Sequence, residues 1–288
     1  MTNKNLAITF SGNSFYFIQF IDSINLKCYH HDGQTKTILI VGLSINMKRF
    51  FINKPLQVNT NVKIDGIEHN HIKNVLRQKI GDEIILVCGD EYDYFAKIVD
   101  ISKGETEVEI TSKEKNTANP KSDVTVFQAL VKSDNMSLIV QKLTELGVKS
   151  FVPFESEFIT SKDKNNKASK LQEISNQSIK QCKRSIPMKV ESVKTFKEIL
   201  EMLGAFDEVI FANECEKTCD LKDLNLKKSS KIALIIGSEG GFSSEEINAL
   251  ISKNAHSISM GNRILRAETA SISLSAVVMY LIGEWHYE

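Results

Sequence analysis

A cation, a carboxylate and a hydroxyl stand close together at the start of a long apolar segment. They are Arg266, Glu268 and Thr269, and the apolar segment runs from Ala267 to about Trp285 with helical spacing. A fixed cation can stabilise negative charge that develops in a reaction, and a carboxylate can accept a proton. Polar residues in this position also serve simply to cap a helix. The three residues are candidates for chemistry, and the elements around them must position them.

A glycine-rich loop lies upstream, between a predicted strand and a predicted helix. Residues 232–236 are wholly apolar, and residues 237–242 read Gly-Ser-Glu-Gly-Gly-Phe. Ser243 and Glu246 follow with the spacing of a capping box, which marks a helix start. The loop has neither the Lys-Ser/Thr pair of a phosphate-binding P-loop nor the G-x-G-x-x-G spacing of a dinucleotide fingerprint. A tight turn without a ligand stays open as an alternative.

A second loop, residues 260–270, follows a short predicted strand at 256–259. Loops that follow neighbouring parallel strands open at the edge of the sheet where α/β proteins bind ligands. In this order and spacing the two loops resemble the cofactor loops of the knotted SPOUT methyltransferases. The segments G-S-E-G-G-F-S and M-G-N-R-I-L-R-A-E-T-A resemble, more narrowly, the RsmE family, which methylates N3 of a uridine in 16S ribosomal RNA. Ser238 departs from that family's usual proline.

The resemblance implies S-adenosylmethionine as the methyl donor. It implies no metal, because the sulfonium already makes the methyl group electrophilic. By analogy with the family, the residues expected to hold the cofactor are Ala212, Gly237, Glu239, Gly240, Gly241, Met260, Gly261, Ile264 and Leu265.

The same resemblance suggests how the reaction is assisted. Uracil N3 becomes a good nucleophile only after its proton leaves, so Arg266 is expected to stabilise the resulting negative charge. An ion pair of Arg266 with Glu239 or Glu268 is the alternative. Glu268 and Glu239 are both candidates for the general base, and solvent is a third.

Composition is typical of a globular protein with a neutral overall charge. The 288 residues are 42% hydrophobic and 25% charged, and Lys plus Arg balance Asp plus Glu at 36 each. A nucleic-acid site must therefore be a local patch. No apolar run approaches the ~20 residues of a membrane span. Five scattered cysteines suit free thiols in the cytoplasm, and Cys215 with Cys219 lacks a second ligand pair for zinc.

The chain divides into three parts. We expect residues 1–46 to be an extension, poorly ordered or not native, because the resemblance begins at Met47. Short alternating segments over 47–115 predict a small β-barrel, which resembles the PUA-like amino-terminal domain of the family. A polar, proline-marked linker follows, and residues 122–288 alternate strands and helices as in an α/β domain with a mostly parallel sheet. The resemblance implies that this domain is a trefoil knot.

Four residues are candidates for contact with RNA. Within 69–77 one helix is expected, with Ile72, Val75 and Leu76 buried and Arg77 at its edge. For Arg77 a phosphate contact and a structural ion pair are equally open. Lys132 lies in a family-like segment, and Gln181 with Arg184 lies in the basic stretch 162–189. Such a stretch is usually a solvated helix face, and beside RNA it can also contact phosphates.

The resemblance implies 16S RNA within assembled 30S subunits as the partner, and a homodimer formed through the last helix. Two rival functions remain. SPOUT 2′-O-ribose methyltransferases also use a G-S-E-G-x-G loop, but they follow it with an S-L-N-V-S-type segment that differs from residues 264–270. A non-catalytic ribosome-assembly factor that binds RNA is the second rival, and the intact loops argue against it.

Overall fold

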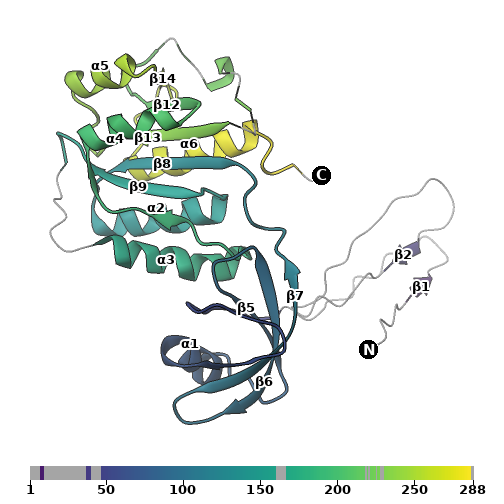
Figure 1. Cartoon of the computed structure of the whole chain (residues 1–288). Coiled ribbons are helices and arrows are strands. Elements are labelled where there is room, and N and C mark those ends of the chain that lie inside the picture. Colours follow the sequence, from purple (N-terminus) through teal and green to yellow (C-terminus); the bar gives the residue numbers. More distant parts are fainter. Residues whose placement is uncertain are drawn as a thin grey trace.

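The computed structural model describes residues 7–9, 37–39, 47–159, 167–217, 219, 221–224, 226–227 and 230–286. Within 1–46 only two short strands fall in this range, β1 (Ala7–Thr9) and β2 (Thr37–Leu39), which pair antiparallel. The rest of the expected extension lies outside the described residues. From residue 47 onward the chain forms a small β-rich unit followed by a larger α/β unit (Figure 1).

The β-rich unit is one mixed five-stranded sheet in the order β3-β5-β6-β7-β4. Its pairs are antiparallel except that of β3 with β5. Inward side chains alternate along each strand and form one apolar core around Phe50, Ile84 and Ile98. The strands are β3 (Arg49–Phe51), β4 (Asn61–Ile64), β5 (Glu83–Val87), β6 (Tyr92–Ile101) and β7 (Thr106–Lys115).

The helix expected over 69–77 differs from the prediction. It consists of α1 (Gly66–Asn70) followed by η1 (His71–Val75), which is a π-helix. In η1 the amide of Leu76 bonds to the carbonyl five residues back, at 2.9 Å. The wider turn breaks the i, i+3 spacing of an α-helix. As a result Ile72 is buried as expected, but Val75 is 62% exposed.

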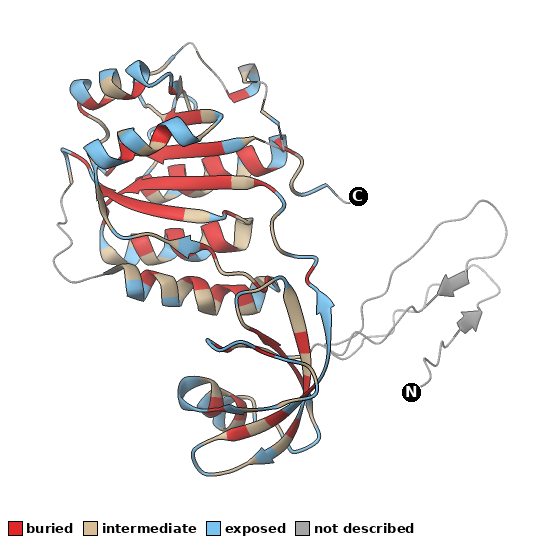
Figure 2. Cartoon of the chain, viewed as in Figure 1, coloured by how far each residue is buried: buried red, intermediate tan, exposed pale blue. Residues whose placement is uncertain are grey.

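The α/β unit is built on seven parallel strands. They follow the order β10-β9-β8-β13-β12-β14, and β11 also pairs with β9. The central strands are buried on both faces (Figure 2), so their apolar runs are continuous, as a parallel sheet requires. The strands are β8 (Asp123–Ala129), β9 (Ser150–Glu155), β10 (Lys189–Val190), β11 (Lys194–Thr195), β12 (Glu208–Ala212), β13 (Lys231–Ile236) and β14 (His256–Ile258).

Helices cover both faces of this sheet and enclose two separate apolar cores. One core packs α2 (Ser133–Leu146), α3 (Lys167–Cys182) and α6 (Ala267–Leu281) on one face. The other packs α4 (Phe196–Met202) and α5 (Ser244–Ser252) on the opposite face. Short 3-10 turns lie at η2 (Leu203–Ala205) and η3 (Leu221–Asp223). The predicted capping box of Ser243 and Glu246 starts α5, and Gly147 ends α2 with φ 100°.

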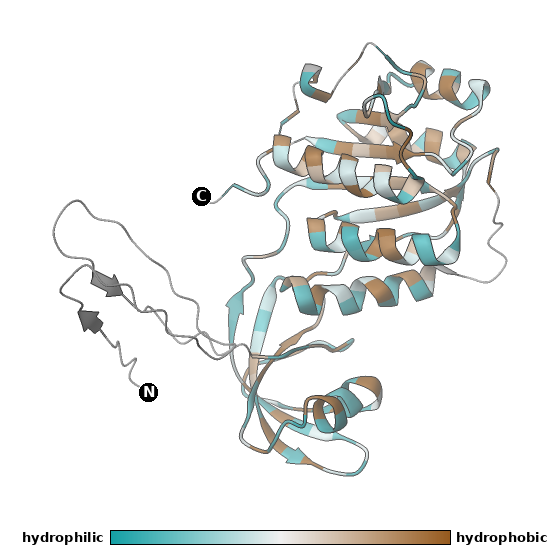
Figure 3. Cartoon of the chain, turned by 180° about the vertical axis from the view of Figure 1, so that it is seen from behind, coloured by the Kyte–Doolittle hydropathy of each residue, from teal (hydrophilic) through white to brown (hydrophobic). Residues whose placement is uncertain are grey.

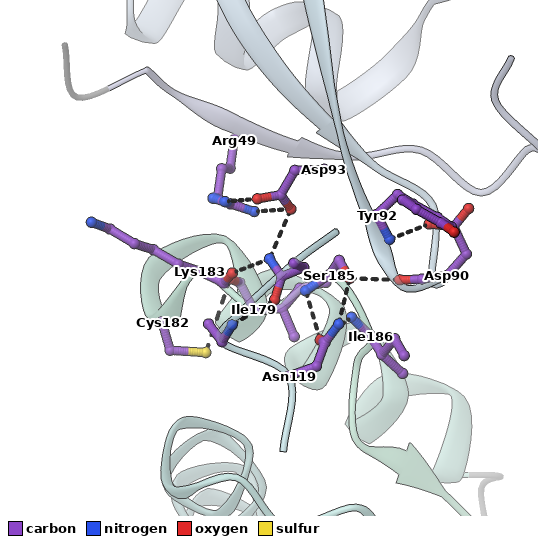
Figure 4. Close-up of polar contacts among 12 residues, drawn as sticks. Arg49, Asp90, Tyr92, Asp93, Asn119, Ile179, Cys182, Lys183, Ser185 and Ile186 are labelled. Carbon is purple, nitrogen blue, oxygen red and sulfur yellow. Dashed lines mark hydrogen bonds and ion pairs between the residues drawn. The ribbon is translucent and has the colours of Figure 1, made fainter. Parts of the chain in front are cut away.

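The two units meet along α3 in a contact that is partly polar and partly apolar. Ile179 of α3 packs against Ile85 and Val87 of β5. Asn116 donates hydrogen bonds of 2.8 Å both to Asp93 and to the carbonyl of Lys183, which joins the two units. Figure 4 shows the interface around Asp93 and Lys183. Asp93 is also held by a two-pronged ion pair with Arg49. These contacts fix the β-rich unit against the end of α3.

Candidate active site

A cavity of about 880 Å³ opens where the parallel strands β8, β12, β13 and β14 end. Loops that follow these four strands form its wall, because parallel strands place their carboxyl ends at one edge. Both loops singled out in the sequence contribute to it. The expected cofactor residues that line it are Ala212, Gly237, Glu239, Gly241, Met260, Gly261, Ile264 and Leu265.

The first loop is a tight turn held from two sides. The Ser238 hydroxyl donates to the carbonyl of Phe158 at 3.0 Å, and the amide of Gly241 donates to the carbonyl of Ser238 at 3.1 Å. Gly241 has φ 71°, which favours glycine. A side chain there would also approach Glu214 on the cavity wall, at 3.5 Å from its Oε1. The positive φ, rather than a lack of space, is therefore the reason for glycine at this position.

Gly240 serves packing and does not line the cavity, which differs from its expected role. A Cβ atom on Gly240 would lie only 2.7 Å from the Cβ of Phe158. The glycine is required because a neighbouring segment approaches the loop closely. The sequence motif alone cannot separate this reason from cofactor binding, since Phe158 is distant in sequence.

The second loop brings the candidate catalytic residues to the same cavity. Arg266 and Glu268 both line it, at the start of α6. Arg266 is exposed, and among the described residues no salt bridge joins it to Glu239 or Glu268. The carboxylate of Glu268 accepts a hydrogen bond of 3.2 Å from Asn135 of α2. Thr269 lies inside α6 and does not cap it. The N-cap position is taken by Arg266, which makes no side-chain capping hydrogen bond.

Several wall residues were missed from the sequence. Asn135 follows β8, while Glu214, Glu216 and Lys217 follow β12. The sequence prediction kept only Ala212, the last residue of β12, although the rule that functional loops follow parallel strands applies to residues 213–217 as well. Their positions could thus have been found from the strand pattern.

The four RNA candidates separate into three environments. Lys132 lines the cavity, and Arg77 and Gln181 are exposed elsewhere on the surface. Arg184 is 2% exposed, and its Nη1 donates to the carbonyls of Thr144 at 2.7 Å and Val148 at 3.1 Å. Burial lowers the pKa of Arg184 to about 10. Its expected RNA contact is corrected, because the guanidinium instead binds carbonyls at the end of α2.

The cavity wall suits a charged, nucleoside-sized ligand. Residues of the two glycine-bearing loops line the cavity, together with the apolar residues Phe242 and Leu265. Carboxylates of Glu214, Glu239 and Glu268 can accept hydrogen bonds from hydroxyl and ammonium groups and can balance a positive charge. The volume is in the range of small-molecule sites. The residues present therefore fit S-adenosylmethionine.

Among the described residues the structure shows neither a cluster of metal ligands nor a membrane-spanning helix. Nowhere in these ranges do three or more His, Cys, Asp or Glu side chains gather as a metal site would need. None of the helices in the described part of the chain is long and apolar enough to cross a membrane.

Comparisons with known proteins agree with this geometry. A family model for an RNA methyltransferase domain matches residues 117–279, and a model for an RNA methyltransferase PUA domain matches residues 64–111. Ribosomal RNA small subunit methyltransferase E of Rickettsia conorii is 32% identical over 237 residues, which cover 81% of this chain and 95% of the relative. The Bacillus subtilis protein of the same name is 28% identical over 247 residues, covering 81% and 96%.

Solved structures show the same architecture. The Neisseria gonorrhoeae ribosomal RNA small subunit methyltransferase E, bound to S-adenosyl methionine, superposes with a TM-score of 0.75 and 26% identity. The match covers 82% of this chain and 98% of that one. A Legionella pneumophila methyltransferase has a TM-score of 0.77 at 24% identity, covering 82% and 98%, and supports the fold.

Fold and cavity thus define an RNA methyltransferase of the SPOUT α/β-knot class with a PUA-like amino-terminal domain. Within that class the chain belongs to the RsmE family of ribosomal RNA small subunit methyltransferases.

Proposed function

We propose that this enzyme transfers a methyl group from S-adenosylmethionine to N3 of a uridine in 16S ribosomal RNA. The observation that carries the proposal is the meeting of both family loops on one cavity, with Arg266 and Glu268 at its wall. Membership of the RsmE family supplies the substrate class. The reaction belongs to the cytoplasm, because its substrate is ribosomal RNA.

The chain's own residues have two tasks in this reaction. When bound, S-adenosylmethionine supplies an electrophilic methyl group. The protein holds uracil N3 near that group, which is mainly a contribution of proximity. Loss of the N3 proton spreads negative charge onto the flanking carbonyl oxygens, and the exposed guanidinium of Arg266 stabilises it. Glu268, whose carboxylate is oriented by Asn135, is our candidate for the group that accepts the proton.

RNA binding is assigned to three exposed or cavity-lining side chains. Lys132 lies at the cavity and would contact a phosphate beside the target base. Gln181 at the end of α3 and Arg77 in the β-rich unit would contact more distant backbone. Contacts of this kind position RNA without reading its sequence. Because these residues lie on two units, we propose that the substrate spans both, as an assembled 30S subunit would.

A homodimer is the proposed working form. The outward side of α6 exposes Val277, Tyr280 and Leu281, which are spaced i, i+3 and i+4 and therefore lie on one helical face. Leu138 of α2 and Trp285 add to the exposed apolar area, and hydrophobic residues show on the outer helices in Figure 3. A second copy would cover this surface.

The deciding experiment is methyl transfer from labelled S-adenosylmethionine to 16S RNA, naked and in assembled 30S subunits, followed by nucleoside analysis. We expect 3-methyluridine, mainly from assembled subunits. A 2′-O-methylated product would keep the enzyme class and overturn the base assignment. Cofactor binding without transfer to either substrate would favour a non-catalytic assembly factor.

A further inference from the structure

Gln128 is a buried amide at the point where two neighbouring strands separate. It lies near the end of β8 and stands in register with Ile236, the last residue of β13. Its side chain has no solvent exposure and does not belong to the cavity wall. The position is therefore directly behind the cavity, in the sheet.

The chain takes opposite directions after this pair of residues. From β8 it enters α2, which packs on one face of the sheet, and from β13 it enters α5, which packs on the other. Divergence of this kind opens the crevice in which α/β proteins bind ligands. It also ends the ladder of hydrogen bonds, so carbonyl groups at this point need another partner.

Gln128 supplies that partner to both strands. Its Nε2 donates to the carbonyl of Gly237 and to the carbonyl of Ala129, each at 3.1 Å. Both neighbours are acceptors, so the NH₂ group must be the part that faces them. The Oε1 atom is then buried without a hydrogen-bond partner among the described residues, which carries a cost in free energy. The two hydrogen bonds that Nε2 donates therefore fix the orientation of the Gln128 side chain.

Gly237 is the residue through which this contact reaches the cavity. It lines the cavity and begins the first loop. A Cβ atom on Gly237 would lie 3.2 Å from the carbonyl carbon of Gly241, so the turn closes tightly on it. Gly237 therefore lies tightly packed inside the turn, and its carbonyl is the group that Gln128 holds.

We propose that Gln128 is a positioning residue that fixes the Gly237 carbonyl and, through it, the cofactor loop 237–242. Gln128 holds the loop from the sheet, while the bond from Ser238 to Phe158 holds it from the other side. This inference rests on the proposed function, because it assigns the loop to S-adenosylmethionine.

Two substitutions of Gln128 and one control test the proposal. Gln128→Met keeps the length and removes the donors, and Gln128→Glu sets carboxylate oxygens against two carbonyls. Thr144→Val is the matched control: its buried hydroxyl bonds to Val140 and Ser175 on α2 and α3, away from the cavity wall. Hydrogen exchange of residues 237–242 is measured without ligand, and S-adenosylmethionine affinity is measured by calorimetry.

We expect faster exchange in the loop of Gln128→Met and a dissociation constant raised by up to about tenfold, because binding must then also order the loop that one buried hydrogen bond no longer holds. Gln128→Glu should be worse, and if it fails to fold, Gln128→Met decides alone. Thr144→Val should melt earlier with exchange and affinity unchanged. Unchanged exchange and affinity in Gln128→Met overturn the proposal. If the wild type binds no S-adenosylmethionine, the proposed function fails, and exchange in the ligand-free loop still decides whether Gln128 holds it.

Discussion

Two arginines in family-like segments have opposite environments. Arg266 is exposed at the cavity, and no salt bridge holds it among the described residues, whereas Arg184 is buried and binds backbone carbonyls. Both were expected from their segments to contact RNA or its reacting base, so local sequence does not distinguish them. The difference arises because the turn after α3 directs Arg184 toward the end of α2. Residue type thus predicts what an arginine can bind, and burial decides whether it can reach a ligand or only the protein backbone.

Replacing Arg266 by alanine should lower turnover far more than cofactor binding. Loss of one preorganised donor that stabilises developing charge costs about 10²–10³ in kcat. We expect a loss of about that size, with the dissociation constant of S-adenosylmethionine nearly unchanged. Arg263→Ala is the control, since Arg263 is also exposed and lines the cavity. A wild-type rate in Arg266→Ala would exclude the proposed role.

Replacing Arg184 by methionine should reduce stability without weakening RNA binding by the folded protein. The substitution leaves the carbonyls of Thr144 and Val148 without this donor, at a cost of about 1–3 kcal/mol in the free energy of unfolding. Urea denaturation measures the loss. Gln181→Ala, at an exposed site nearby, should show the reverse pattern. Full stability with weaker RNA binding in Arg184→Met would restore its original assignment.

Among the secondary-structure elements, the contact between α1 and α3 is the least expected. Lys180 of α3 forms a 2.8 Å ion pair with Glu68 of α1, and both side chains are about one-eighth exposed, at 13% and 12%. From the sequence, Lys180 was only one of the cations in the basic stretch 162–189. Its partner lies in the other unit, so helix periodicity within α3 cannot reveal it. The pair adds a charged contact to the polar interface of Figure 4.

A double-mutant cycle on Glu68→Gln and Lys180→Met should show that this pair couples the two units. Removing one partner leaves a mostly buried charge unpaired, while removing both does not. We expect an interaction energy of about 0.5–3 kcal/mol from urea unfolding of the four proteins. The exposed pair of Lys63 with Glu105 provides a control with little coupling. Additive effects at Glu68 and Lys180 would contradict the prediction.

At the scale of the whole molecule, the outer face of α6 is apolar while the chain carries no net charge. We expect the wild type to sediment as a dimer and Leu281→Asp to sediment as a monomer, because a carboxylate would be buried in the interface. Ile251→Asp is the matched control: Ile251 is 51% exposed on α5, on the opposite face of the sheet. A stable wild-type monomer at working concentration would remove the dimer.

The sequence by itself predicted the parallel sheet, the capping box of α5 and the two loops that are expected to hold the cofactor, because each depends on residues close together in the chain. Only the tertiary structure showed which groups Gly240, Arg184, Lys180 and Gln128 contact. In each of these cases the partner is a distant residue: Phe158, Thr144, Glu68 and Gly237, respectively. The prediction that Val75 is buried was wrong for a related reason, because a π-helix has a wider turn than an α-helix while the apolar sequence pattern is the same. Local patterns fix elements and loops, whereas packing between distant segments fixes what each polar side chain does.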